Sequence, residues 1–177
     1  MKIDESNPLD RFFTGLSEYI FHTRLGVVDT ELVDYVSELL IRFTRVDSQA
    51  KVRKSDGKPA KEVTSMVAEA EKRLGDAKRE VHRHIGDYTL FWSGLYPEAL
   101  RQLQSKDKTD FFLNYCAQGK KAYLIASNIQ ADKKSASGDL LHRMSEHFEM
   151  CAYGLREIRR EWERRDEDGT EEAPLLL

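Results

Sequence analysis

The stretch LHRMSEHFEMCAYGLREIRREW, residues 141–162, decides the fold. Its large apolar residues recur at steps of three and four positions, in the order Leu141, Met144, Phe148, Cys151, Leu155, Ile158 and Trp162. On an α-helix these steps gather the side chains into one seam, and an apolar seam must be buried against other helices. Two earlier stretches repeat the spacing, one through Leu32, Val36, Leu39, Phe43 and Val46, the other through Val63, Val67, Ala70, Leu74, Ala77, Val81, His84 and Tyr88. The three seams predict an all-α helical bundle.

Helix boundaries follow from the residues that start and stop helices. Capping residues, glycines and prolines predict about six helices, mostly with antiparallel neighbours, at 9–24, 29–46, 61–94, 97–103, 110–130 and 138–165. Gly75 and Gly86 interrupt the third helix, and the sequence leaves open whether it continues through Gly86. We predict a single helical domain over residues 1–165, with a polar connection at 47–60 and an acidic disordered tail at 166–177.

The composition is typical of a water-soluble bundle with heavily charged outer faces. Of the 177 residues, 40% are hydrophobic and 33% are charged, and the formal net charge is -3. This charge gives no sequence-wide attraction to nucleic acid, and no apolar run approaches the ~20 residues of a membrane span. The polar, acidic start lacks a secretory profile, and Cys116 and Cys151 fall in apolar helical patterns that favour free buried thiols. We therefore expect a cytoplasmic protein without a membrane segment.

One residue of the middle seam is unusual, because His84 occupies a position that favours an apolar side chain. On a continuous helix Glu80 and Asp87 share its face, and a neighbouring carboxylate can orient an imidazole as a metal ligand or general base. His22 and His147 are candidates for completing a metal or haem site. The paired Glu-x-x-His motif of carboxylate-bridged di-iron bundles is absent, so the sequence favours an ordinary core histidine and no cofactor.

Four large side chains form a candidate interaction patch at a predicted corner between helices. Phe91, Trp92, Leu95 and Tyr96 surround Gly94 there. Aromatic residues anchor many protein interfaces, so an exposed corner would bind a partner; packing onto the end of the bundle is the alternative.

The corner and the long seams together favour a non-catalytic interaction or scaffolding module that binds another protein or a second copy of itself. A metal- or haem-binding enzyme with a histidine and carboxylate site around His84 is the alternative function. The sequence identifies neither the partner nor a substrate or pathway.

Overall fold

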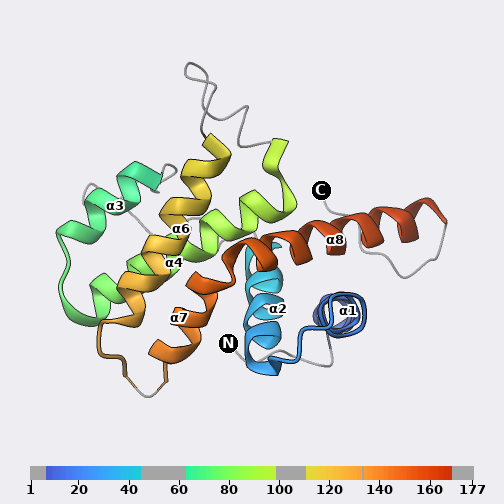
Figure 1. Ribbon diagram of the computed structural model, residues 1–177, viewed down its shortest axis with the longest axis horizontal. Coiled ribbons are helices and arrows are strands. Elements are labelled where there is room, and N and C mark those ends of the chain that lie inside the picture. Colours follow the sequence, from blue (N-terminus) through green and yellow to red (C-terminus); the bar gives the residue numbers. More distant parts are fainter. Residues whose placement is uncertain (1–6, 45–62, 99–110, 133, 169–177) are drawn as a thin grey trace.

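A computed structural model describes residues 7–44, 63–98, 111–132 and 134–168, and within these ranges it contains helices and no strand. The elements are α1 (Pro8–Glu18), the π-helical turn η1 (Tyr19–Arg24), α2 (Thr30–Thr44), α3 (Val63–Glu71), α4 (Gly75–Leu95), α6 (Phe111–Ser127), α7 (Gly138–Glu146) and α8 (Phe148–Glu167). The helices share one hydrophobic core, which confirms the predicted all-α bundle (Figure 1). No described helix combines the length and apolar character needed to cross a membrane.

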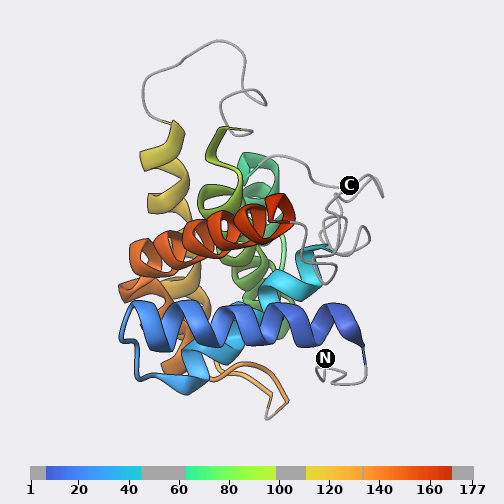
Figure 2. The ribbon, with the colours of Figure 1, turned by 90° about the vertical axis from the view of Figure 1, so that its right-hand side faces the viewer.

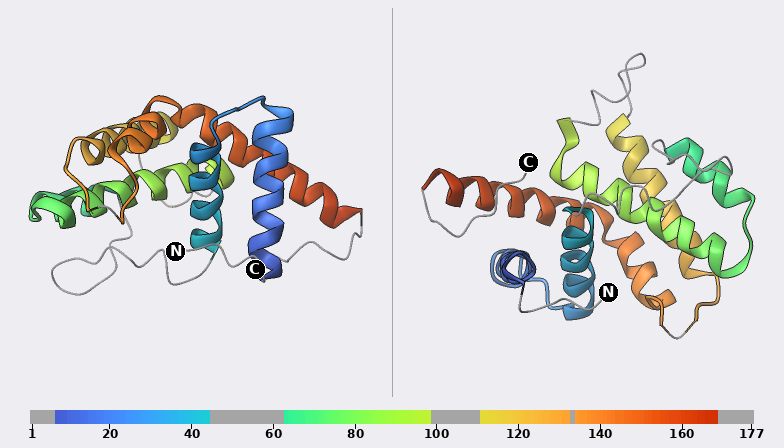
Figure 3. Two further views of the ribbon diagram at one scale, coloured as in Figure 1. Left: turned by 90° about the horizontal axis from the view of Figure 1, so that it is seen from below. Right: turned by 180° about the vertical axis from the view of Figure 1, so that it is seen from behind.

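The central helix is α4, which packs along α6 and also contacts α3, α8 and α2. Figure 1 shows α3, α4 and α6 on one side of the molecule and α1 and α2 on the other, with α7 between the two groups. α8 passes above α1 (Figure 2) and crosses it in the view from below (Figure 3). Seen from below, α1 and α2 lie side by side (Figure 3). Because α4 contacts both groups, its side chains can join them.

The C-terminal seam is buried along its whole length, but over two helices rather than the predicted one. All seven of its residues are at most 6% exposed. α7 ends and α8 begins at His147, whose backbone leaves the helical conformation with φ -103° and ψ 22°. The single helix predicted at 138–165 is therefore wrong. The break lets α7 pack on α6 while α8 continues across α4 toward α1.

The helix predicted at 61–94 is also two helices. A turn follows α3, and Gly75, the first residue of α4, has φ +55°, a conformation that glycine adopts without steric cost. Leu74, which the sequence pattern assigned to the seam, lies in this turn and is 86% exposed. α4 then continues through Gly86, which answers the question that the sequence left open. A side chain at Gly86 would collide with its neighbour, because a Cβ there would lie 2.6 Å from the ring of Tyr123.

Helix ends agree with the capping signals of the sequence at two further places. Ser137 caps α7, since its hydroxyl accepts a hydrogen bond from the amide of Leu140 at 3.0 Å. The N-terminal helix stops before Gly26, which has φ +68°. α8 extends to Glu167, slightly beyond the predicted domain end. The connection predicted at 47–60, residues 169–177 of the predicted tail and most of the helix predicted at 97–103 lie outside the described residues.

Candidate functional site

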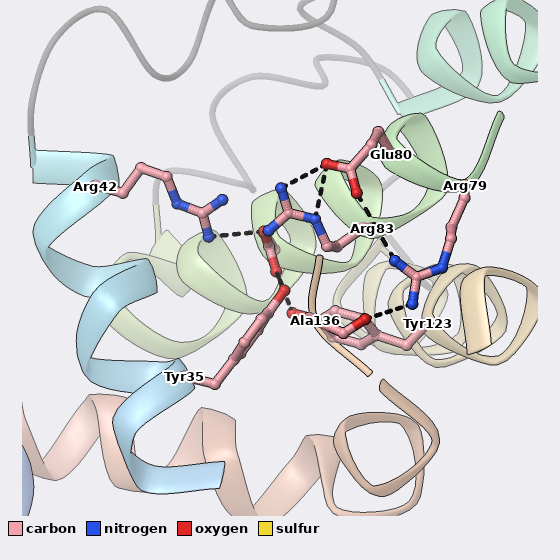
Figure 4. Close-up of polar contacts among 8 residues, drawn as sticks. Tyr35, Arg42, Arg79, Glu80, Arg83, Tyr123 and Ala136 are labelled. Atoms are coloured by element: carbon pink, nitrogen blue, oxygen red, sulfur yellow. Dashed lines mark hydrogen bonds and ion pairs between the residues drawn. The ribbon is translucent and has the colours of Figure 1, made fainter. Parts of the chain in front are cut away.

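A fully buried carboxylate, Asp87 of α4, joins three helices. Its Oδ1 accepts hydrogen bonds from the hydroxyls of Tyr35 on α2, at 2.6 Å, and Tyr123 on α6, at 2.7 Å. Its Oδ2 accepts a hydrogen bond from Arg42 of α2 at 2.8 Å, and Arg83 lies 3.8 Å away. Figure 4 shows Arg42 and Tyr35 reaching from α2 toward Arg83 on α4. We call these five side chains the Asp87 cluster.

The charges of the Asp87 cluster compensate one another. Burial by itself would raise the pKa of Asp87, but Arg42 and Arg83, with the two tyrosine hydroxyls, hold that pKa below its usual range. Burial and the nearby carboxylate raise the pKa values of Tyr35 and Tyr123, so both hydroxyls keep their protons and donate them. A buried ionised carboxylate is stable only when it is paired and hydrogen-bonded in this way. The cluster therefore fixes α2 and α6 against α4.

A second buried charge holds the connection between α6 and α7 in place. Arg79 of α4 is 1% exposed, and its Nε donates to the carbonyl of Ile129 at 3.1 Å. Its Nη2 donates to the carbonyl of Ala136. The neighbouring Glu80 accepts two hydrogen bonds from Arg83, at 2.7 and 3.1 Å, and lies 3.8 Å from Arg79 (Figure 4). α4 thus positions both the acidic and the basic groups next to this connection.

The space between α2, α4 and this connection is an open pocket of about 490 Å³. That volume falls within the usual range of small-ligand sites, about 300–1,000 Å³. The pocket is lined mainly by polar and charged residues: Glu31, Asp34, Tyr35, Glu38, Glu80, Arg83, Lys134, Ser135, Ala136 and Leu140. Two of these lining residues, Tyr35 and Arg83, also belong to the Asp87 cluster, so polar contacts inside the bundle hold them in place.

Two of the four carboxylates that line the pocket are already paired within the chain. Arg143 of α7 binds Glu31, and Arg83 binds Glu80. Asp34 and Glu38 form no ion pair with any described residue, and Lys134 forms none either. Partial burial raises the pKa of Glu38, and the nearby charges of Arg42 and Arg83 oppose that rise. Among the described residues, the pocket therefore presents two carboxylates on α2, Asp34 and Glu38, and one lysine, Lys134, that form no ion pair.

The structure does not bring the predicted metal donors together. His84 stacks on Phe43, with ring centroids 5.7 Å apart, while Glu80 and Asp87 bind the arginines and tyrosines described above. His22 bonds through Nδ1 to the carbonyl of Val27 at 2.6 Å, and His147 is exposed at the junction of α7 and α8. Among the described residues, no three His, Cys, Asp or Glu side chains are grouped so that they could hold a metal ion.

The predicted aromatic corner is largely part of the core. Phe91 and Leu95 are buried, so they offer no surface to a partner. Trp92 and Tyr96 are partly buried, and the guanidinium of Arg159 lies 5.0 Å from the centre of the Tyr96 ring. These side chains therefore pack onto the end of the bundle, which was the alternative to an exposed interaction patch.

Sequence reasoning missed Asp34 and Glu38, although they left a signal. With Glu31 they form a row of carboxylates at steps of three and four along α2, which places all three on one exposed face of that helix. A row of like charges on a helix usually marks a face that is exposed to solvent. Only its position at a pocket distinguishes this row of carboxylates from such a face.

A scan against protein-family models found no match, and neither curated proteins nor solved structures matched the chain. We therefore infer the function from the geometry and charge of the pocket.

A second histidine of α4, His82, is buried among charged groups. It is 3% exposed, and its Nε2 has no hydrogen-bond partner within the described residues. The charged groups around it are Lys78 on α4, Glu71 on α3 and Lys121 on α6. Burial, reinforced by the two lysines, lowers the pKa of His82 below its usual 6.5. At neutral pH the environment of His82 in the folded protein therefore favours the neutral imidazole.

We expect the free energy of unfolding to fall as the pH drops below about 6.5, because the unfolded chain then binds a proton that folded His82 resists. The contribution of His82 to the free energy of unfolding is fully present above that pH. It is lost as the pH falls from about 6.5 to the lower pKa that His82 has in the folded protein. Urea denaturation between about pH 7 and pH 5 measures it. His82→Leu should flatten this dependence, whereas His142→Gln, at an exposed position, should preserve it. Equal slopes in wild type and His82→Leu would contradict this account.

Proposed function

We propose that the protein is a non-catalytic interaction module whose pocket binds a positively charged segment of a partner protein. The observation that carries the proposal is that Asp34 and Glu38 line an open pocket and form no ion pair with any described residue. Two adjacent carboxylates repel each other, so a cation placed between them gains attraction and also relieves that repulsion. Complementary charge also speeds the encounter of two proteins.

The rigidity of the pocket supports a binding role. Its lining residues Tyr35 and Arg83 are held through Asp87, which joins α2, α4 and α6, and Arg79 binds the connection between α6 and α7 that contributes to the lining. A preformed site loses less conformational entropy when it binds, which leaves more of the interaction energy for affinity.

The chemistry of the described side chains also supports binding rather than catalysis. Both cysteines are buried; burial raises the pKa of Cys116, and it raises the pKa of Cys151 to about 12. A thiol with a raised pKa is a poor nucleophile at neutral pH. The tyrosines of the Asp87 cluster are likewise held protonated, and their hydroxyls are used in structural hydrogen bonds.

The test is a calorimetric titration of the full chain with an acetylated and amidated basic peptide, Ser-Lys-Arg-Lys-Arg-Ser, at low salt. The acidic counterpart, Ser-Glu-Asp-Glu-Asp-Ser, is the control ligand. Asp34→Asn combined with Glu38→Gln should weaken basic-peptide binding about tenfold, the effect of losing two ion pairs at a partly exposed site.

A matched control variant is Asp166→Asn combined with Glu167→Gln. It removes the same two charges from α8, which contributes no residue to the pocket, and it should bind like wild type. Absence of basic-peptide binding, or equal weakening in both double variants, would overturn the proposal.

The sequence also predicted two alternatives, a metal or haem site and self-association, and each can be measured separately. Metal- or haem-dependent activity around His84 predicts stoichiometric metal, or a haem absorption band, in the purified protein. Self-association predicts a dimer or larger species by light scattering at high concentration. Bound metal that is lost on His84→Ala in a folded protein would replace the interaction proposal.

A further inference from the structure

We infer that the pocket selects arginine: one guanidinium group of the partner lies between Asp34 and Glu38 and binds both carboxylates. This inference rests on the proposed function and names the chemical group that the pocket takes. The chain already binds its own arginines at the same carboxylate row in this way.

The beginning of α2 shows how that row binds a cation. Arg143 of α7 places Nη1 on Asp29 and Nη2 on Glu31, so one guanidinium joins two carboxylates. Glu31 is also a lining residue of the pocket. Asp34 and Glu38 continue the same row by one and two further helical turns, without an ion pair to any described residue.

The opposite wall of the pocket repeats this arrangement. Arg83 lies 2.7 Å from Glu80 and 3.8 Å from Asp87, which are two turns apart on α4. Both pocket carboxylates that have a partner are therefore bound by a guanidinium group, and in each case that group reaches a second carboxylate. A planar group with five donors can serve two carboxylates at once, whereas the ammonium of lysine acts as a point charge.

Part of the remaining lining suits the stem of an arginine side chain. Besides its carboxylates, the pocket is lined by Tyr35, Ala136 and Leu140, which have apolar atoms, and by the polar residues Arg83, Lys134 and Ser135. Long cationic side chains bury their methylene groups on apolar surface while the charged end stays among polar groups. The hydroxyl of Tyr35 is held by Asp87, so its ring is fixed in place.

The experiment compares three acetylated and amidated peptides, Gly-Ser-X-Ser-Gly, in which X is arginine, lysine or citrulline. Citrulline keeps the shape of arginine but carries no charge. Binding to the full chain is followed through amide chemical shifts in an isotope-labelled sample. We expect the arginine peptide to bind at least about fivefold more tightly than the lysine peptide, and the citrulline peptide to show no saturable shifts.

The variants locate the site. Asp34→Asn and Glu38→Gln, each made alone, should both reduce the preference for arginine over lysine, because each removes one of the two carboxylates that the guanidinium joins. Both positions are exposed, so the variants should unfold at the same urea concentration as wild type within error. Asp166→Asn should keep the full preference.

The outcomes separate the two proposals. Equal affinities for arginine and lysine would overturn the selectivity and leave the proposed function standing. Binding of none of these peptides, nor of the longer basic peptide, would overturn both. The chain also carries Lys51, Arg53, Lys54 and Lys58 outside the described residues. Arginine binding that occurs only after these four become glutamine would identify the chain itself as the occupant and overturn the assignment to a partner.

Discussion

Replacing Asp87 with asparagine should lower the free energy of unfolding by about 3–5 kcal/mol, the usual cost of removing one partner from a buried ion pair. The substitution keeps the shape of the side chain but leaves the positive charges of Arg42 and Arg83 without their buried counter-ion. Urea denaturation followed by circular dichroism measures the loss.

Two variants calibrate this result. Tyr123→Phe removes one hydrogen bond to Asp87 and should cost about 1–2 kcal/mol. Asp139→Asn changes an exposed carboxylate of α7 and should stay within about 0.5 kcal/mol of wild type. A loss below about 1 kcal/mol in Asp87→Asn would contradict a central role for the Asp87 cluster.

The same cluster predicts the response to acid. The pKa of Asp87 is lower in the folded protein than the usual 3.8, so its contribution to stability is complete above that pH. The contribution is lost as the pH falls through the pKa of the folded state, because the unfolded chain is protonated first. Asp87→Asn should remove this part of the acid sensitivity.

Replacing Gly119 with alanine should destabilise the protein by about 1–3 kcal/mol, in spite of the roughly 1 kcal/mol by which alanine favours a helix. A Cβ at this position of α6 would collide with the hydroxyl of Thr89 on α4 and with the ring of Phe148 on α8. Neither neighbour can yield easily, since both are fully buried and Thr89 donates to the carbonyl of Ile85. Thermal or urea unfolding measures the change.

Gly15→Ala is the matched control. Gly15 also lies inside a helix, α1, but a Cβ added there would meet no atom of a neighbouring described element within 4 Å. Alanine should therefore stabilise the protein there by about 0.5–1 kcal/mol. If both glycine variants changed stability in the same direction, close packing at Gly119 would not be the cause.

The helical class was predictable from the sequence because seams at steps of three and four residues specify both a helix and the face it buries. The break at His147 was not, since the seam continues through it from Met144 to Phe148 without a change of spacing. Periodicity records which side chains are buried, and it does not record the direction of the helix axis. The turn at Gly75 was signalled by the glycine itself, whereas Gly86 carried the same signal and lies inside a continuous helix.

The site was harder to predict, for a physical reason. Helical spacing identifies neighbours one turn away, and it placed Glu80, His84 and Asp87 on one face. The partners that hold Asp87 come instead from other helices: Tyr35 is 52 positions distant and Tyr123 is 36. Such pairings depend on how helices cross, which local patterns do not encode. The sequence therefore identified the segment of α4 that carries Asp87, but it did not identify the residues of α2 and α6 that contact this carboxylate.

The shared carboxylate at the centre of the bundle also limits which combinations of substitutions the chain can accept. Loss of Asp87 alone removes the shared buried counter-ion of Arg42 and Arg83, and loss of Arg42 alone removes one of the hydrogen-bonded charges that hold the carboxylate, so the effects of such changes do not add. Well-packed apolar residues can replace a buried ionic group when all its members change together. We therefore expect these positions to change together during evolution. A homologue that lacks Asp87 should also lack Arg42 and Arg83.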